Sequence, residues 1–274
     1  MRTYLLVLVL ILPLGLIAQR RPKIKGNRDV IIVDQPLSAF HTVVLQDNLT
    51  LELRKATNPG YTITADANLI EVLRFEVVDS ILEVSSFYDI VAKKQMEITI
   101  YCPELRGITV NKGKIVNNTM MMADKLSLKV RGDARLDIEA NAISADLMVA
   151  DRARIDLNLD VDNLNVNMTD KTEGTLYATS DRQSISIGNN VVLDLQGRVD
   201  TLQVLMVDAS KLRAAQLLAD HVDLSVQDAS IARIRAQNSF NLEAGATSKT
   251  WLYGNPTITI EAFIEAAQLH KKQD

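Results

Sequence analysis

The feature that most constrains this chain is a short turn that recurs about every 19 residues. In each repeat an alternating apolar segment ends at a small or polar residue, and a second alternating segment begins shortly afterwards. The turn positions are residues 132, 151, 170, 189, 208, 228 and 246, and their successive spacings are 19, 19, 19, 19, 20 and 18. A fixed period of this length is typical of a solenoid, in which each repeat forms one coil stacked on the next.

The segments between the turns alternate apolar and polar residues, which predicts β-strands rather than helices. Clear examples are residues 126–130, 164–168 and 222–226. One repeat has a contour of roughly 60 Å, which suits several short strands around a narrow core. We therefore predict an all-β chain that folds as a parallel β-helix, or β-solenoid, with coils of about 19 residues. Stacking of the coils is expected to bring together Leu128, Met148, Val166 and Ser186.

Other folds fit this pattern less well. Leucine-rich repeats share the period, but their helical side and asparagine ladder are absent from this sequence. An outer-membrane barrel needs aromatic girdles, whereas only 4% of the residues here are aromatic. A β-sandwich also has regular short strands, yet it does not require so even a spacing. Two segments have helical character: residues 66–73 predict one short helix, and residues 261–269 predict either a helix or a final strand.

The N-terminus has the pattern of a secretory signal peptide. Met1 and Arg2 form a basic start, residues 5–17 are largely apolar, and Ala18 is the expected cleavage point. A membrane anchor is the alternative, but the run is short for a span of about 20 residues. We therefore predict an exported protein, whether periplasmic, at the outer surface or secreted, with no membrane span after cleavage. The predicted organisation is a signal peptide (1–18), a basic linker (19–35), a β-helical domain (36–260) and a C-terminal tail (261–274).

Three parts of the chain carry a family resemblance. They are FHTVVLQDNLTLEL at 40–53, YTITADANL at 61–69 with VVDSILEV at 77–84, and TWLYGNPTI at 250–258. Their order resembles the head GIN domain family, also called the putative auto-transporter adhesin family, which is common in secreted proteins of Bacteroidota. The resemblance implies a right-handed β-helix, an adhesin-like role and no assigned active-site residues. The family favours Gly-Ser-Gly-like turns, whereas Asp-x-Ala and Asp-Ala-Ser replace most of them here.

The acids at the turns are the first candidates for a site. If the coils stack in register, Asp151 lies beside Asp170, and Asp208 lies beside Asp228. Carboxylates about 5 Å apart repel each other, and a bound Ca²⁺ would relieve that repulsion. The alternative is a structural turn, because an aspartate side chain readily accepts a local backbone N–H. We prefer the turn and predict no bound metal, since glycine and asparagine occupy the equivalent positions 132 and 189.

Trp251 and Tyr253 are the second candidate. They are two residues apart and therefore lie on one face of a strand. They could present a ligand patch for sugars, or they could close the core of the last coil, which is the preferred interpretation. The only cysteine, Cys102, lies in an apolar stretch, which predicts a buried structural residue rather than a nucleophile. The three histidines lack the spacing of a zinc site.

These features predict a binding protein rather than an enzyme. The net charge is −4 and the bases are scattered, which argues against nucleic acid as a partner. Pectinase-like β-helix lyases and hydrolases need acids that converge on one groove, whereas the acids here recur along the whole chain. We therefore predict an adhesin-like module without catalysis or a cofactor, which contacts glycans or proteins of the envelope or host. A polysaccharide lyase or hydrolase and a purely structural envelope scaffold are the alternatives.

Overall fold

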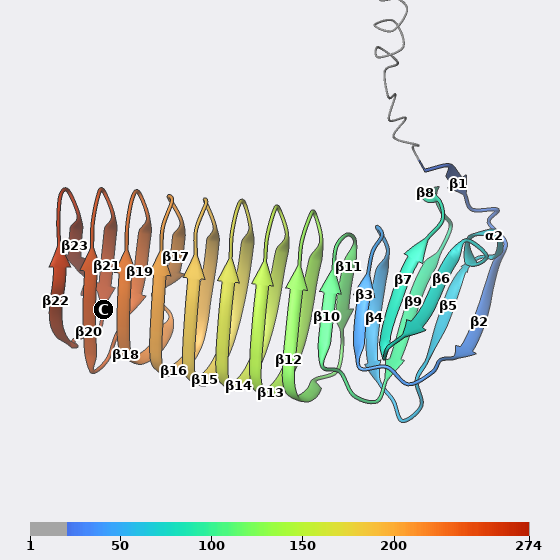
Figure 1. The fold of residues 1–274 in the computed structure, drawn as a ribbon, viewed down its shortest axis with the longest axis horizontal. Coiled ribbons are helices and arrows are strands. Elements are labelled where there is room, and N and C mark those ends of the chain that lie inside the picture. The colour runs from blue at the N-terminus through green and yellow to red at the C-terminus, as the bar shows by residue number, and fades with distance from the viewer. Residues whose placement is uncertain (1–20, 274) are drawn as a thin grey trace, which may run out of the picture.

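Equivalent strands of successive repeats pair in parallel, so the chain winds into a β-solenoid of about nine turns (Figure 1). The computed structural model describes residues 21–273, and the predicted signal peptide therefore lies outside the described residues. We call the face that leads into the recurring turn the first face, and the face that follows it the second face. The prediction of an all-β solenoid with coils of about 19 residues is confirmed.

The central turns are the most regular part of the solenoid. Each long strand starts on the second face, bends once, and returns along the first face to the next recurring turn. Equivalent residues pair at a separation of 19, as Leu157 does with Leu176. The strands are β12 (Met121–Val130), β13 (Arg135–Val149), β14 (Arg154–Met168), β15 (Glu173–Ile187) and β16 (Val192–Met206).

The C-terminal turns continue the same ladder with shorter strands. Residues 261–263 and 268–271 belong to the last turn, because β22 pairs with β20 and β23 pairs with β21. The segment 261–269 is thus a strand end, a turn and a strand start rather than a helix. The strands are β17 (Lys211–Ala214), β18 (Leu217–Val226), β19 (Ile231–Arg235), β20 (Ser239–Ala244), β21 (Lys249–Tyr253), β22 (Thr257–Phe263) and β23 (Gln268–Lys271).

The N-terminal turns contain shorter parallel strands that pair onto the central ladder. On the first face, β7 pairs with β3, and β3 pairs with β10. On the second face, β9 pairs with β4, and β4 pairs with β11. These strands are β3 (Thr42–Leu45), β4 (Thr50–Lys55), β7 (Ile81–Ser86), β9 (Met96–Cys102), β10 (Gly107–Val110) and β11 (Lys114–Asn117).

Beyond these turns the pairing becomes antiparallel and closes the N-terminal end. Strand β6 pairs with β7, β5 pairs with β9, and β2 pairs with β5. The predicted short helix is present but spans only α2, whose Leu69 is fully buried. The rings of Tyr61 and Phe75 stack with their centroids 4.1 Å apart. The elements are β1 (Lys23–Lys25), β2 (Val30–Pro36), β5 (Gly60–Asp66), α2 (Ala67–Ile70), β6 (Leu73–Val78) and β8 (Asp89–Ala92).

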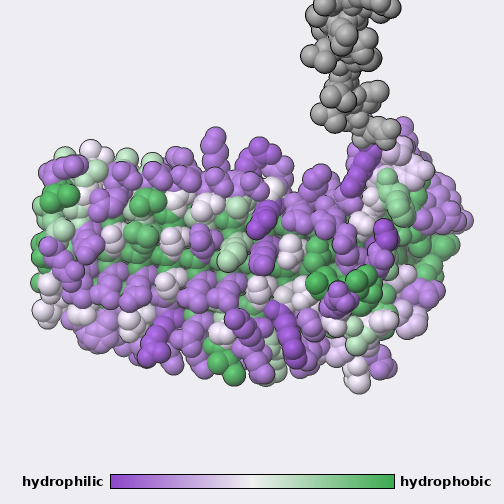
Figure 2. Space-filling model, in the orientation of Figure 1, coloured by the Kyte–Doolittle hydropathy of each residue, from purple (hydrophilic) through white to green (hydrophobic). Residues whose placement is uncertain are grey.

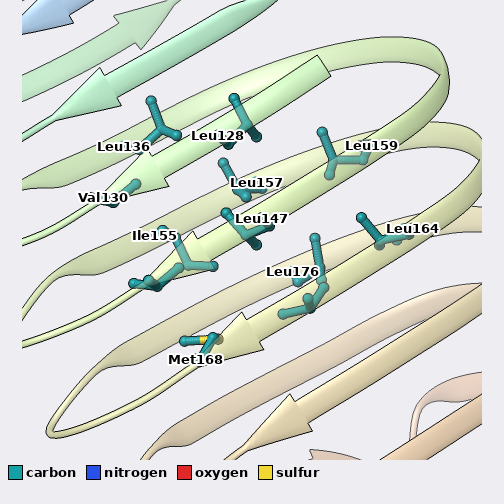
Figure 3. Packing of buried hydrophobic residues seen from close by; sticks show 14 of the residues in the cluster. Leu128, Val130, Leu136, Leu147, Ile155, Leu157, Leu159, Leu164, Met168 and Leu176 are labelled. Atoms are coloured by element: carbon teal, nitrogen blue, oxygen red, sulfur yellow. The ribbon is translucent and has the colours of Figure 1, made fainter. Parts of the chain in front are cut away.

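Inward side chains form columns that run along the solenoid axis (Figure 3). One column contains Leu128, Leu147, Val166 and Ile185, which pair in register and are all buried. The predicted stack was therefore wrong by one residue at Met148 and Ser186, which lie on the outer side of the same strands. A shift of one residue reverses the side of a strand on which a side chain lies.

The two irregular spacings in the sequence have separate structural causes. Ala214 pairs with Ile234 at a separation of 20, because an extra residue is accommodated where the chain turns at 215–216. His221 pairs with Ser239 at a separation of 18, because the connection at 236–238 is shorter. The first change lies on the second face just before the bend marked by Asp220, and the second lies at the bend itself; strand pairing is interrupted at both places. Length changes are tolerated there because they do not shift the core columns.

The described residues, 21–273, include no helix that is both long enough and apolar enough to cross a membrane.

Candidate functional site: the turn ridge and the Trp251 patch

The recurring turn places one residue of each repeat in the left-handed region of backbone conformation. Asparagine, aspartate and glycine tolerate this conformation better than other residues. This requirement explains why glycine, aspartate and asparagine replace one another at the equivalent position of successive turns while the backbone conformation stays the same. The residues and their φ angles are Gly132 (65°), Asp151 (68°), Asp170 (65°), Asn189 (58°), Asp208 (55°), Asp228 (58°) and Ala246 (53°).

The aspartates of this turn ridge also connect neighbouring turns of the solenoid. The backbone N–H of Gly132 donates to Oδ2 of Asp151 at 2.8 Å, and that of Asp151 donates to Oδ2 of Asp170 at 3.2 Å. Asp208 and Asp228 repeat the arrangement at 3.2 Å. The carboxylates of Asp151, Asp170 and Asp228 therefore each accept a hydrogen bond from the turn before. Residues 21–273 contain no group of three or more acidic, histidine or cysteine side chains placed to hold a metal ion.

Calcium is expected to leave the melting temperature of this protein unchanged at millimolar concentration. The carboxylate oxygens already accept backbone N–H groups, and Arg152 and Lys171 lie in the same open hollow as Asp151 and Asp170. Thermal unfolding followed by circular dichroism measures this directly. A rise in melting temperature that is present in the wild type and absent in Asp170→Asn would show instead that the ridge binds the cation.

A second acidic line runs along the bend between the two faces. Strand register places one outward aspartate of each of four successive turns at this bend. The sequence prediction did not include this line of acids. The signal that marks the bend is a pair of consecutive outward residues inside an otherwise alternating strand. The acids are Asp162, Asp181, Asp200 and Asp220. Arg198 lies 3.9 Å from Asp220, so part of this charge is offset.

Cys102 is buried, as predicted, and its Sγ lies 3.8 Å from the carbonyl oxygen of Arg54. Burial raises the pKa of the thiol to about 11. The thiolate, which is the nucleophilic form, is therefore scarce at neutral pH. The histidines are also separate: His221 contacts Ser239, and His270 contacts Gln268.

We expect the thiol of native Cys102 to react with Ellman's reagent roughly a hundredfold or more slowly than an exposed thiol at the same pH. Burial and the raised pKa both reduce the reactive thiolate. The reference is the exposed thiol of Ser184→Cys in a Cys102→Ala background, because Ser184 lies on the outer side of β15. Equal rates for the two thiols would contradict the burial of Cys102.

Trp251 and Tyr253 lie on the outer side of β21, on the second face. The alternating residues Thr250 and Leu252 are buried, so they, and not Trp251, face the core of this turn. Arg233 lies over the Trp251 ring with its Cζ 5.6 Å from the centroid, and Arg235 lies 6.0 Å from the Tyr253 centroid. On the other side of Trp251, the His270 ring stacks at a centroid distance of 5.5 Å.

Positive charge surrounds these rings because of the strand register. Lys211 and Lys249 lie in the column beside Trp251, two turns apart. We call this set the Trp251 patch; it comprises Lys211, Arg233, Arg235, Lys249, Trp251, Tyr253 and His270. The sequence prediction named only the two aromatic residues, because the arginines come from a strand 18 residues earlier in the chain.

The balance of charge on the second face changes at Arg213. Before it, bases pair with acids one turn away: Lys114 with Asp137 at 3.1 Å, and Arg154 with Glu173 at 3.2 Å. Arg213 itself lies 3.2 Å from Asp194. Among the described residues, no ion pair involves the bases Lys211, Arg233 or Lys249 of the Trp251 patch. These cations are therefore available to a ligand.

Comparison with known proteins supports the predicted family. The sequence profile described as putative auto-transporter adhesin, head GIN domain, matches residues 39–256. A comparison with curated proteins found no match.

Solved structures share the fold at low identity. A putative adhesin from Parabacteroides merdae has a TM-score of 0.64 at 13% identity, covering 92% of this chain and 99% of its own. A putative lipid binding protein from Parabacteroides distasonis has a TM-score of 0.65 at 14% identity, covering 91% and 99%. A putative adhesin from the same species has a TM-score of 0.60 at 13% identity, covering 90% and 99%. With a profile match over most of its length, this chain belongs to the head GIN domain family of putative auto-transporter adhesins.

Proposed function

We propose that this chain is an exported, non-catalytic binding module that holds acidic glycans at the Trp251 patch. The observation that carries the proposal is the row of rings and bases on the second face, with Arg233 over Trp251 and Arg235 over Tyr253. Among the described residues, Lys211, Arg233 and Lys249 of this row take part in no ion pair. Membership of an adhesin family supports a role at the cell surface or outside the cell.

The donors of the patch suit a sugar that carries carboxylate or sulfate groups. Within the described residues, neither the indole N–H of Trp251 nor the guanidinium of Arg233 has a hydrogen-bond acceptor. A guanidinium can donate two parallel hydrogen bonds to one carboxylate or sulfate group. The aromatic rings add apolar surface for the C–H groups of the sugar. Because strands hold these groups in place, little conformational entropy is lost on binding.

The alternatives explain these observations less directly. A lyase or hydrolase of the pectinase type needs acids that converge on one groove, whereas the outward acids here are spread along the turn ridge and the bend. A purely structural scaffold does not require bases without an acid partner, such as Arg233 and Lys249, beside partly exposed rings. Envelope or host proteins that display clustered acids could use the same patch, and a glycan test distinguishes them.

A glycan array tests the proposal. We expect binding to acidic oligosaccharides, such as those with uronic acid or sulfate groups, and little binding to their neutral counterparts. Trp251→Ala and Arg233→Ala are each expected to weaken binding roughly tenfold or more, because anchors of this kind carry much of the affinity. Binding is also expected to weaken with added salt, which screens the charges.

Two exposed residues on the same face serve as matched controls. Tyr177→Ala removes an aromatic ring and Arg135→Ala removes a base, both at a distance from the patch. Neither control is expected to change binding. A silent array, or binding that survives both Trp251→Ala and Arg233→Ala, would overturn the assignment to this patch. Release of unsaturated sugar products would point to a lyase instead.

A further inference from the structure

The two ends of the solenoid differ in how their cores finish. At the N-terminal end, α2 joins β5 to β6 across the core, and the strands there turn antiparallel. At the C-terminal end, β22 and β23 each pair on one side only in the described chain, with β20 and β21 respectively. The backbone N–H and C=O groups on their other side are unpaired. Such an open edge favours pairing with another strand.

The core columns also end uncovered at the last turn. In β20 the inward residues Phe240 and Leu242 are fully buried. Their partners in β22, Ile258 and Ile260, are 41% and 51% exposed, and Phe263 is 44% exposed. These residues continue buried columns, so their exposure results from the missing next turn. Figure 2 shows hydrophobic colour reaching the surface at this end of the molecule.

We propose that two copies of this chain associate end to end through the open last turn, with β22 of each copy pairing antiparallel with β23 of the other. A two-fold axis parallel to the strands produces this arrangement. It exchanges the two faces but keeps the direction of each strand, so β22 of one copy lies beside β23 of the other, which runs the opposite way. In Figure 1, β22 and β23 lie on opposite faces with opposite directions, as the arrangement requires. The contact continues both strand ladders across the junction and covers the exposed core residues.

The charges of the last turn favour a second copy in this orientation. Glu261 lies on β22 and Glu265 in the turn that follows, whereas His270 and Lys271 lie on β23 and Lys272 directly after it. Neither glutamate takes part in an ion pair among the described residues. Pairing β22 with β23 of the partner subunit sets acids opposite bases. Pairing each strand with its own copy would instead place like charges close together, which is unfavourable.

A head-to-tail chain of copies fits less well. It would have to join the open last turn to the N-terminal end, where, among the described residues, β2 and β6 also pair on one side only but α2 lies over the core with Leu69 fully buried. The contact between two C-terminal ends is closed, because it uses both open edges of the last turn and leaves none there for a third copy. The expected assembly is therefore a dimer and not a filament.

Analytical ultracentrifugation of the protein over a wide concentration range tests this inference. We expect a reversible dimer of limiting mass twice that of one chain. Ile260→Lys is expected to raise the dissociation constant roughly tenfold or more, because it places a charge in the buried centre of the contact. The matched control is Ile143→Lys, which changes an equally exposed isoleucine at the bend between the faces. Circular dichroism establishes that both variants fold.

A charge exchange separates this contact from a non-specific apolar one. Glu261→Lys is expected to weaken the dimer, and adding Lys271→Glu to the same chain is expected to restore it, because both signs are then reversed across the contact. A chain that stays monomeric at every concentration overturns the proposal. An assembly that grows without limit would also overturn the proposal, and so would a dimer whose dissociation constant is unaffected by Ile260→Lys.

Discussion

The Leu176→Ala variant is expected to lose about 2–5 kcal/mol of unfolding free energy. Leu176 is fully buried in β15, and its column continues through Leu157 on one side and Leu195 on the other. Hydrogen-bonded ladders hold the backbones of both neighbouring turns, so the solenoid can collapse only partly into the cavity. Urea unfolding followed by circular dichroism measures the loss.

The adjacent residue provides a matched control for Leu176. Tyr177 is 50% exposed on the outer side of the same strand, and Tyr177→Ala is expected to change stability by less than about 0.5 kcal/mol. Each turn of a solenoid contacts mainly its neighbours, so faster amide exchange in Leu176→Ala should concentrate in β14–β16 and spare β20. Equal losses for the two variants would contradict the assignment of the inner and outer sides.

The Gly197→Ala variant is expected to lose about 3 kcal/mol or more of unfolding free energy. In a chain of this size, that loss lowers the melting temperature by about 6–12 °C. Gly197 has a φ of 109°, and a Cβ at this position would lie 2.1 Å from the carbonyl oxygen of Ala178. That oxygen belongs to the backbone of a paired strand. Relief of the clash therefore requires the ladder itself to shift. Differential scanning calorimetry gives the change in melting temperature.

Gly245→Ala is the control for Gly197→Ala. Its added Cβ would lie 2.4 Å from Oε1 of Gln227, the free end of a flexible side chain that can turn away. Gly245 is also absent from the residues with positive φ among those described. The expected loss of unfolding free energy is therefore clearly smaller than that of Gly197→Ala. If both variants lose the same amount, the close approach of Gly197 to the neighbouring backbone is not what limits substitution there.

Much of the fold could be predicted from local patterns. The recurring turn position was found at seven places from 132 to 246, because few residue types tolerate the left-handed backbone at Asp151 or Asn189. The equivalent residue of the last turn, Glu265, was not found, because glutamate is not a typical residue for this conformation. Inner and outer sides were predicted wherever alternation was strict, as in residues 164–168. The stack of core residues failed at Met148, because the neighbouring Leu147 is also apolar and a local pattern cannot choose between them.

The candidate site was predicted less completely than the fold. Trp251 and Tyr253 stood out by residue type, and their spacing placed them on one side of a strand. Arg233 and Lys211 did not stand out, because they lie 18 and 40 residues before Trp251 in a chain with many scattered bases. Strand register brings them together.

The sequence by itself determined that this protein is a repeat of short strands with a turn about every 19 residues, since turn conformation and alternation depend on nearby residues alone. Only the tertiary structure decided which outward residues become neighbours, which bases lack an acid, and which end of the core stays open. These properties depend on the register between strands about one repeat apart, and that register is set by packing in the core. Outward side chains such as Arg233 and Trp251 contribute little to that packing, so their juxtaposition follows from the core and cannot be read from their own pattern.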